Sequence, residues 1–176
     1  MKGIALAVLL ACTLYAGAQQ KQPSTLRSIL LTELKNSHDK SDSFVCGNIA
    51  LANLTPQQAN WTDGKGNHSV GQLAYHMVFW DKYSVAKLRH ETPEKFSGNN
   101  DDTFTNFDPK QWSDVVHQFD DAMTRLERMV ESATDEQLAE WAPELTLVAN
   151  HNAYHIGEIV MVRKEQGVWD AGKGVK

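Results

Sequence analysis

The chain has 176 residues, a hydrophobic content of 41% and a formal charge of −5 at pH 7. This length and composition predict one globular domain that is long enough to bury a single core. An acidic chain without a basic stripe is a poor candidate for binding nucleic acid or anionic lipid, so we expect neither as a partner.

The first residues predict a secretory signal peptide. A positive charge is followed by a short apolar run, and Ala16-Gly17-Ala18 supplies the small residues of a cleavage site. We therefore expect a signal peptide at residues 1–18 and a mature domain at residues 19–176, exported to the periplasm or the extracellular space. Leu9-Leu10-Ala11-Cys12 also resembles a lipoprotein signal. Lipid attachment at Cys12 ranks second, because the apolar run continues past it.

The mature chain is expected to be stabilised by packing alone. Only Cys46 remains after removal of the signal peptide, so no internal disulfide can form. We interpret Cys46 as a small buried residue, because no local residue supplies the base that a nucleophilic thiol needs. No later stretch is apolar for long enough to cross a bilayer, so we expect no membrane insertion of the mature protein.

Capping residues and apolar spacing predict helices in the first half of the chain. A helix opens at Pro23-Ser24 and runs to about Lys40, and His38 near its end is interpreted as a surface residue favoured by the helix dipole. Residues 41–54 fit either a helix extension or a packed loop. Thr55-Pro56-Gln57-Gln58 is a capping box that starts a short helix.

A second capping box, Ser69-Val70-Gly71-Gln72, starts an apolar helix that carries His76 and extends to about Leu88. Residues 91–107 then have the composition of a long loop that contains three phenylalanines. Aromatic residues in such a loop can form a lid or substrate wall, or can pin the loop to the surface, and the sequence favours neither. The three are Phe96, Phe104 and Phe107.

Two further long helices are predicted in the second half. Asp108 caps a helix whose apolar residues keep three-and-four spacing for about six turns, with His117 on its solvent side. Thr134 caps one short turn that ends near Pro143, and a separate helix then runs to the residue before Gly167. Four long amphipathic helices without period-two alternation predict an all-α fold. We expect an antiparallel four-helix bundle with a long loop between the second and third long helices.

Three histidines are candidate metal ligands. His151 and His155 are four residues apart, so they lie on one helix face, and that face is apolar. His76 lies on another apolar helical segment and can supply a third imidazole. Three neutral imidazoles with a free coordination position form the ligand set of a catalytic metal site. The alternative is that they are ordinary core histidines bound to carbonyls or hydroxyls, because the spacing lacks the Glu of the metalloprotease motif.

Three segments resemble the DinB/YfiT-like superfamily. They are residues 69–81 (Ser69-Val70-Gly71-Gln72-Leu73-Ala74-Tyr75-His76-Met77-Val78-Phe79-Trp80-Asp81), residues 152–163 (Asn152-Ala153-Tyr154-His155-Ile156-Gly157-Glu158-Ile159-Val160-Met161-Val162-Arg163) and the short capped helix within residues 51–61. The resemblance implies a four-helix bundle in which three histidines bind a divalent metal ion, and His76, His151 and His155 match those ligands. Several relatives are thiol-dependent transferases or isomerases. The resemblance therefore also implies a metal that binds the sulfur of a low-molecular-weight thiol.

Glu158 departs from the superfamily pattern, which usually has Gln at this position. It can accept an imidazole N–H from His155, act as a general base or serve as a fourth ligand. We favour the first two roles, because carboxylate support of a ligand imidazole is the commoner arrangement. The predicted export weakens the thiol assignment, since such thiols are chiefly cytoplasmic. Hydrolysis by a metal-bound water needs no cofactor.

Two functions follow as hypotheses. The first is a metal-dependent enzyme for a small-molecule substrate, a thiol-dependent transferase or a hydrolase, with Zn²⁺ or Ni²⁺ held by His76, His151 and His155 and Glu158 as the general base. The second is a non-catalytic module that binds metal or a small ligand. Imidazole ligands suit several metals and do not choose between them. The sequence is compatible with a homodimer but does not fix the oligomeric state.

Overall fold

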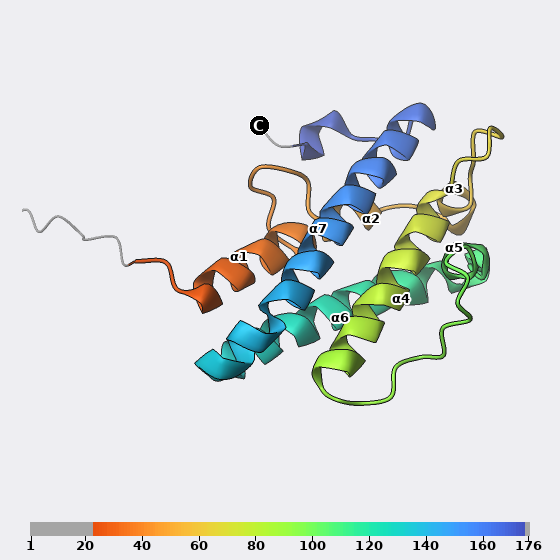
Figure 1. Cartoon of the computed structure of the whole chain (residues 1–176). Coiled ribbons are helices and arrows are strands. Elements are labelled where there is room, and N and C mark those ends of the chain that lie inside the picture. Colours follow the sequence, from red (N-terminus) through yellow and green to blue (C-terminus); the bar gives the residue numbers. More distant parts are fainter. Residues whose placement is uncertain (1–22, 175–176) are drawn as a thin grey trace, which may run out of the picture.

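A computed structural model of the chain describes residues 23–174, and this part contains seven α-helices, two 3-10 helices and no strand (Figure 1). The all-α prediction is therefore confirmed. The predicted signal peptide at residues 1–18, with Cys12, lies outside the described residues. The long helices are α1 (Leu26–His38), α4 (Val70–Leu88), α6 (Trp112–Ser132) and α7 (Asp135–Glu165).

The remaining helices are short and lie in the connections. Residues 41–54, for which the sequence left two interpretations, contain the short helix α2, and the long connection between α4 and α6 contains α5. None of the helices within residues 23–174 combines the length and apolar character that crossing a membrane requires. The short elements are α2 (Gly47–Leu51), α3 (Pro56–Ala59), α5 (Asp102–Thr105) and the 3-10 helices η1 (Pro109–Gln111) and η2 (Ala171–Lys173).

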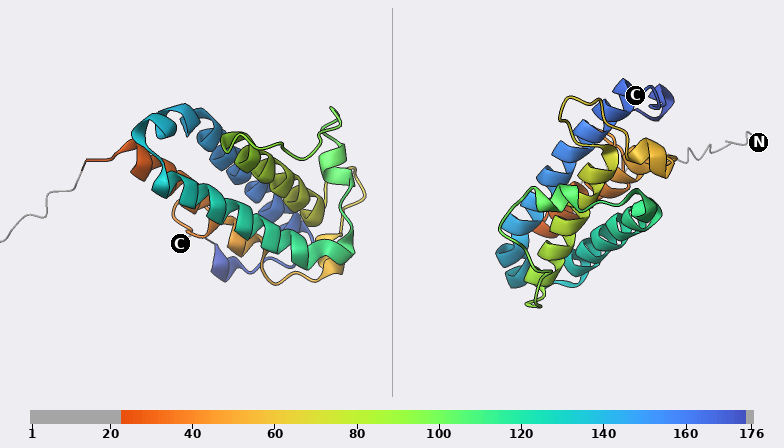
Figure 2. Two further views of the ribbon diagram at one scale, coloured as in Figure 1. Left: turned by 90° about the horizontal axis from the view of Figure 1, so that it is seen from below. Right: turned by 90° about the vertical axis from the view of Figure 1, so that its right-hand side faces the viewer.

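Each long helix packs against two others. α1 contacts α6 and α7, and α4 contacts the same two helices. Figure 1 shows α4 beside α7, and Figure 2 shows from two further sides that the connection between α4 and α6 runs outside the long helices. His76 of α4 meets His151 of α7, and Ser84, further along α4, meets Glu144, earlier in α7. These two pairs show that α4 and α7 run in opposite directions.

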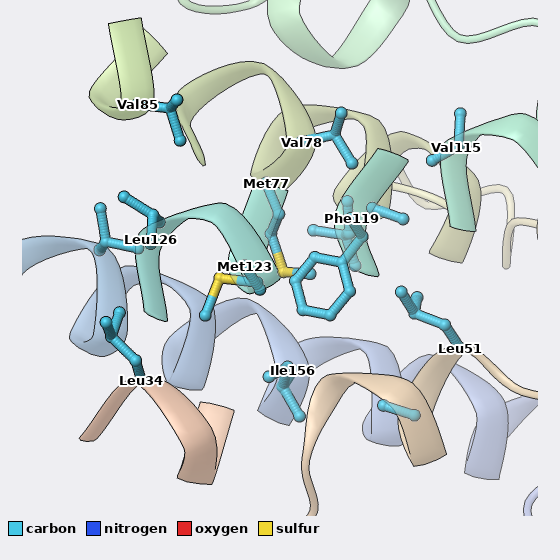
Figure 3. Packing of buried hydrophobic residues seen from close by; sticks show 14 of the residues in the cluster. Leu34, Leu51, Met77, Val78, Val85, Val115, Phe119, Met123, Leu126 and Ile156 are labelled. Carbon is cyan, nitrogen blue, oxygen red and sulfur yellow. The ribbon is translucent and has the colours of Figure 1, made fainter. Parts of the chain in front are cut away.

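Large apolar side chains from the four long helices meet in one core (Figure 3). Side chains that are at most 3% exposed come from each helix: Leu34, Met77, Phe119 and Ile156. Burial of one such side chain stabilises the folded chain by about 1.5–3 kcal/mol relative to leaving it in water. Cys46 is also fully buried, as predicted.

Capping boxes start four of the helices. In α3, α4 and α7 they are the ones predicted from the sequence, and in α1 the N-cap is Thr25. In each box the N-cap hydroxyl accepts the N–H of the third helical residue, whose side chain accepts the N–H of the cap. These bonds satisfy two backbone donors that have no partner within the helix. The predicted helix starts follow from this local chemistry.

The prediction of a helix break near Pro143 is wrong, because α7 is one helix of 31 residues with Pro143 inside it. Proline lacks the N–H that would bind the carbonyl of Ala139, and this costs about 3 kcal/mol in a helix. Both residues are exposed, and the opposite face stays apolar across the proline. Burial of that face outweighs the lost bond. The buried residues on it are Leu138, Trp141, Leu145 and Val148.

The prediction that His38 is a surface residue is also wrong. His38 is 3% exposed, and it follows Leu30 and Leu34 at four-residue spacing on the inner face of α1. Its Nδ1 donates to Glu127 Oε1 at 2.7 Å and its Nε2 donates to Asp120 Oδ1 at 2.9 Å. Burial lowers the pKa of His38, but the hydrogen bonds to the two carboxylates outweigh burial and raise that pKa above its usual 6.5.

Glu127 and Asp39 lie close enough to His38 to form a group of metal-ligand type. However, both ring nitrogens of His38 already donate to carboxylates. A doubly protonated imidazole has no lone pair for a metal. We therefore interpret His38 as an imidazolium that links α1 to α6.

We expect the stability contributed by His38 to depend on pH. Its raised pKa means that this stability is fully present below pH 6.5 and is lost as the pH rises through the folded-state pKa. Burial raises the pKa of Glu127, but hydrogen bonds from His38 and Lys35 outweigh it, so the net pKa is lowered. The stability from Glu127 is therefore present above pH 4.5 and is lost as the pH falls through its folded-state pKa.

Thermal unfolding of His38→Gln should consequently show its largest deficit between pH 4.5 and 6.5, the two ordinary pKa values. We expect that deficit to be about 1.5–3 kcal/mol, the value of hydrogen bonds to charged groups. His90→Gln, at an exposed position after α4, is the control and should show no such window. A deficit that is constant from pH 4 to 9 would show that His38 is not charged in the fold.

Candidate metal centre

The structure brings the three predicted histidines together at one point between α4 and α7. His151 Nε2 lies 3.0 Å from His76 Nε2 and 3.1 Å from His155 Nε2. His76 and His155 are buried and His151 is half-buried. One nitrogen from each ring therefore faces the same small region.

The outer nitrogens of two of these rings have partners that fix their protonation. His76 Nδ1 lies 2.6 Å from Thr103 Oγ1, whose hydroxyl donates to Asn100 O at 2.6 Å. That hydroxyl hydrogen is used, so His76 Nδ1 must donate its N–H to Thr103. His155 Nδ1 donates to Glu158 Oε2 at 2.7 Å. In their neutral forms His76 and His155 therefore carry lone pairs at Nε2.

The three facing nitrogens cannot all be satisfied by protons in neutral rings. His151 Nε2 carries at most one hydrogen and can donate it to only one of its two neighbours. At least one contact is then left without a hydrogen between its two nitrogens, and a cation between the rings would satisfy all three. Two nitrogens at 2.0–2.1 Å from one tetrahedral ion lie about 3.3 Å apart, close to the observed contacts. These residues fit a divalent metal ion.

The surroundings also favour the neutral imidazoles that bind metals. Burial, then the neighbouring imidazoles, lower the pKa of His76 to about 3. Burial and the nearby His155 lower the pKa of His151 to about 4. Burial lowers the pKa of His155 as well, although Glu158 opposes that shift. All three rings are thus neutral at pH 7, with lone pairs available.

A cavity of about 570 Å³ opens beside the three histidines, which form part of its wall. This volume is typical of sites for small molecules. Much of the remaining wall is aromatic or aliphatic, including Trp80, Phe104, Leu147 and Val148. A small molecule bound there would lie next to the imidazole rings.

Two of the three loop phenylalanines, Phe104 and Phe107, divide between the two roles that the sequence left open. Phe104 is buried and stacks on His76, with ring centroids 3.8 Å apart and planes 8° apart, so it forms a wall of the site. Its ring also stacks on His68, 4.0 Å away. Phe107 instead anchors the connection, because its ring lies where a Cβ at Gly71 would be, 2.2 Å from that position.

Several residues of this site carry no signal in the sequence that predicts their position. Thr103 and His68 lie in segments without helical periodicity, so nothing in the sequence placed them beside His76. Asp81 and Asn152 lie on the predicted helices, but helical spacing alone does not predict that they pair. Asn152 Nδ2 donates to both oxygens of Asp81, at 3.0 and 3.1 Å, and both residues are fully buried.

Burial raises the pKa of Asp81 to about 8, although the hydrogen bond from Asn152 opposes that shift. A carboxyl group with this pKa is largely protonated at pH 7. Asp81 also lines the cavity. The Asp81–Asn152 pair therefore joins α4 to α7 one residue away from His151 without placing a full charge in the interior.

The fold and the site define a helical protein whose three-histidine group is suited to a divalent ion. The family model of the DinB superfamily matches residues 48–159, and the chain belongs to this superfamily, which is associated with metal binding. The matched residues include the three histidines and Glu158. No curated protein and no solved structure matches the chain.

Proposed function

We propose that this protein is a metal-dependent enzyme that acts on a small-molecule substrate. Its fold is interpreted as an antiparallel four-helix bundle, which agrees with the closed ring of contacts among α1, α6, α4 and α7. His76, His151 and His155 hold one divalent ion, with Zn²⁺ and Ni²⁺ as the first candidates. The observation that carries the proposal is the convergence of three Nε2 atoms whose protons cannot satisfy one another.

A divalent ion held by these residues would lower the pKa of a coordinated thiol or water and so supply a nucleophile at neutral pH. The chain itself positions the ligands. Thr103 holds the ring of His76, and Glu158 holds the ring of His155, each by a bond to the outer nitrogen. Phe104 covers one face of the His76 ring, and the cavity beside the histidines leaves room for a substrate.

Glu158 is proposed to support His155 rather than to serve as a fourth ligand. Its carboxylate binds Nδ1, and this nitrogen lies across the ring from the Nε2 that faces the other histidines. The Glu158 side chain is 40% exposed, so a second role as a general base for a substrate proton is compatible with its position. Thiol transfer and hydrolysis both use such a site, and they are the two reactions that we propose.

The enzyme proposal is tested by metal content together with turnover. Protein prepared without an affinity tag should contain about one divalent ion per chain. The metal-loaded protein should convert members of a panel of esters and of thiol–acceptor pairs, and chelation should stop the reaction until metal is restored. Bound metal without turnover across the panel would contradict the enzyme proposal and would indicate the non-catalytic module instead.

Thr103→Val should weaken metal binding by about 10–100-fold, the usual effect of losing a partner of a ligand histidine. The variant keeps the shape of the side chain but removes the oxygen that accepts the His76 N–H. Competition with a chromophoric chelator measures the affinity. Thr105→Val is the matched control, because Thr105 is an exposed residue of the same helix α5. Equal affinities of the two variants would show that Thr103 does not orient His76.

A further inference from the structure

The cavity has a second polar region, distant from the histidines. Ser84 and Lys87 lie on α4 and Glu144 lies on α7, and all three line the cavity. Glu144 Oε1 accepts from Ser84 Oγ at 2.7 Å, and Glu144 Oε2 accepts from Lys87 Nζ at 2.6 Å. The carboxylate is therefore fixed by two donors that come from the facing helix.

These groups are unequally exposed. Ser84 is 5% exposed, and the side chains of Glu144 and Lys87 are 16% and 57% exposed. An ion pair at a protein surface contributes only about 0–1 kcal/mol to stability. A carboxylate held in the wall of a cavity, beside an ammonium group that reaches solvent, is a poor source of stability but a suitable recognition element.

The second polar region lies along the same helix faces as the metal centre. Ser84 is eight residues after His76 in α4, and Glu144 is seven residues before His151 in α7. At 1.5 Å per residue these intervals are about 12 Å and about 10.5 Å along the helix axes. The wall between the two ends includes Trp80 and Val148. The cavity is thus polar at both ends and apolar in between.

Charge complementarity defines the group that fits the second polar region. A lone cation that binds Glu144 would be repelled by Lys87, and a lone anion that binds Lys87 would be repelled by Glu144. A group with an ammonium and a carboxylate on the same carbon pairs with both, through charge-assisted hydrogen bonds. Each oxygen of Glu144 accepts one hydrogen bond and has a lone pair left, and the Lys87 ammonium has further hydrogens to donate.

We infer that Ser84, Lys87 and Glu144 bind the α-amino-acid end of the substrate. The substrate is an elongated molecule with this zwitterionic end, an apolar middle along Trp80 and Val148, and a group at the other end that reaches the metal centre. Only the binding of this last group depends on the proposed function. The amino-acid end is recognised by residues that are not metal ligands.

Calorimetric titration tests the zwitterionic end with three probes of equal chain length: α-aminooctanoic acid, octylamine and octanoic acid. We expect α-aminooctanoic acid to bind at least about tenfold more tightly than either single-charge probe, since one additional charge-assisted bond has about that effect. Glu144→Gln should abolish the preference over octanoic acid, and Lys87→Met should abolish the preference over octylamine. Glu140→Gln and Lys82→Met change exposed residues of the same helices outside the cavity, and they should retain both preferences.

A fourth probe separates this inference from the metal proposal. The thiol that carries the same α-amino-acid end should bind still more tightly after the protein is loaded with Zn²⁺, and His151→Ala should remove only that gain. If the thiol brings no gain, the metal proposal fails while the amino-acid end stands. The inference is overturned if α-aminooctanoic acid does not bind, if the three probes bind equally, or if Glu144→Gln and Lys87→Met preserve both preferences.

Discussion

Replacement of His151 by alanine should reduce the metal content of the purified protein from about one divalent ion per chain to a trace. His151 contributes the Nε2 that contacts both of the other ligand nitrogens, so its removal leaves only His76 and His155. Its ring is only half-buried, so the fold should survive. Elemental analysis of wild type and variant measures the effect.

Unfolding experiments give an independent measure of the same change. Metal at a hundredfold excess over its Kd should stabilise the wild type by about 2.7 kcal/mol, because it binds the folded chain. His151→Ala should show almost none of this gain. His117→Ala replaces an exposed histidine of α6 and should retain both metal and gain. Equal metal content in His151→Ala and His117→Ala would rule out a metal bound by the three-histidine group.

The parts of the fold that were predicted correctly depend on neighbours in sequence. A capping box needs only two residues three apart, and the boxes at Thr55, Ser69 and Thr134 all start helices. The pairing of His151 with His155 likewise follows from the helical repeat. The position of His76 opposite them depended on the resemblance to a known superfamily, because spacing within one helix does not specify its partner.

The errors occur where long-range contacts decide the outcome. Pro143 is a helix breaker by local chemistry, but the buried face of α7 runs past it on both sides. His38 has a polar side chain, but Glu127 and Asp120 from α6, more than eighty residues away, neutralise its charge in the interior. Thr103 reaches His76 from a connection whose sequence predicted only a loop. The partners of His38 and Thr103 lie on elements other than their own.

Hydrogen bonds between α4 and α7 also hold the site in place. Asn152 and Asp81 join α7 to α4 through buried hydrogen bonds, one residue from His151. Further along the same two helices, Ser84 and Glu144 join them again. The histidines and the second polar region are therefore supported by fixed helix faces, and a change at Glu158 should affect the chemistry of the site more than its shape.

Two substitutions of Glu158 should separate its two proposed roles. Gln retains an oxygen that can accept the N–H of His155, so Glu158→Gln should bind metal nearly as well as the wild type. Ala removes that acceptor, and metal affinity should fall about 10–100-fold. If Glu158 is also the general base, turnover of the metal-loaded Gln variant should fall by about 10²–10⁴, because the amide cannot take a proton.

Measurement at saturating metal distinguishes these outcomes, since any remaining loss of turnover then belongs to the chemical step. A Gln variant with full metal and full turnover would assign Glu158 to the support of His155 alone. Glu165→Gln, an exposed position two turns further along α7, is the control for the loss of one negative charge. If Glu158→Ala binds metal as tightly as the wild type, the hydrogen bond between Glu158 and His155 does not support the metal centre.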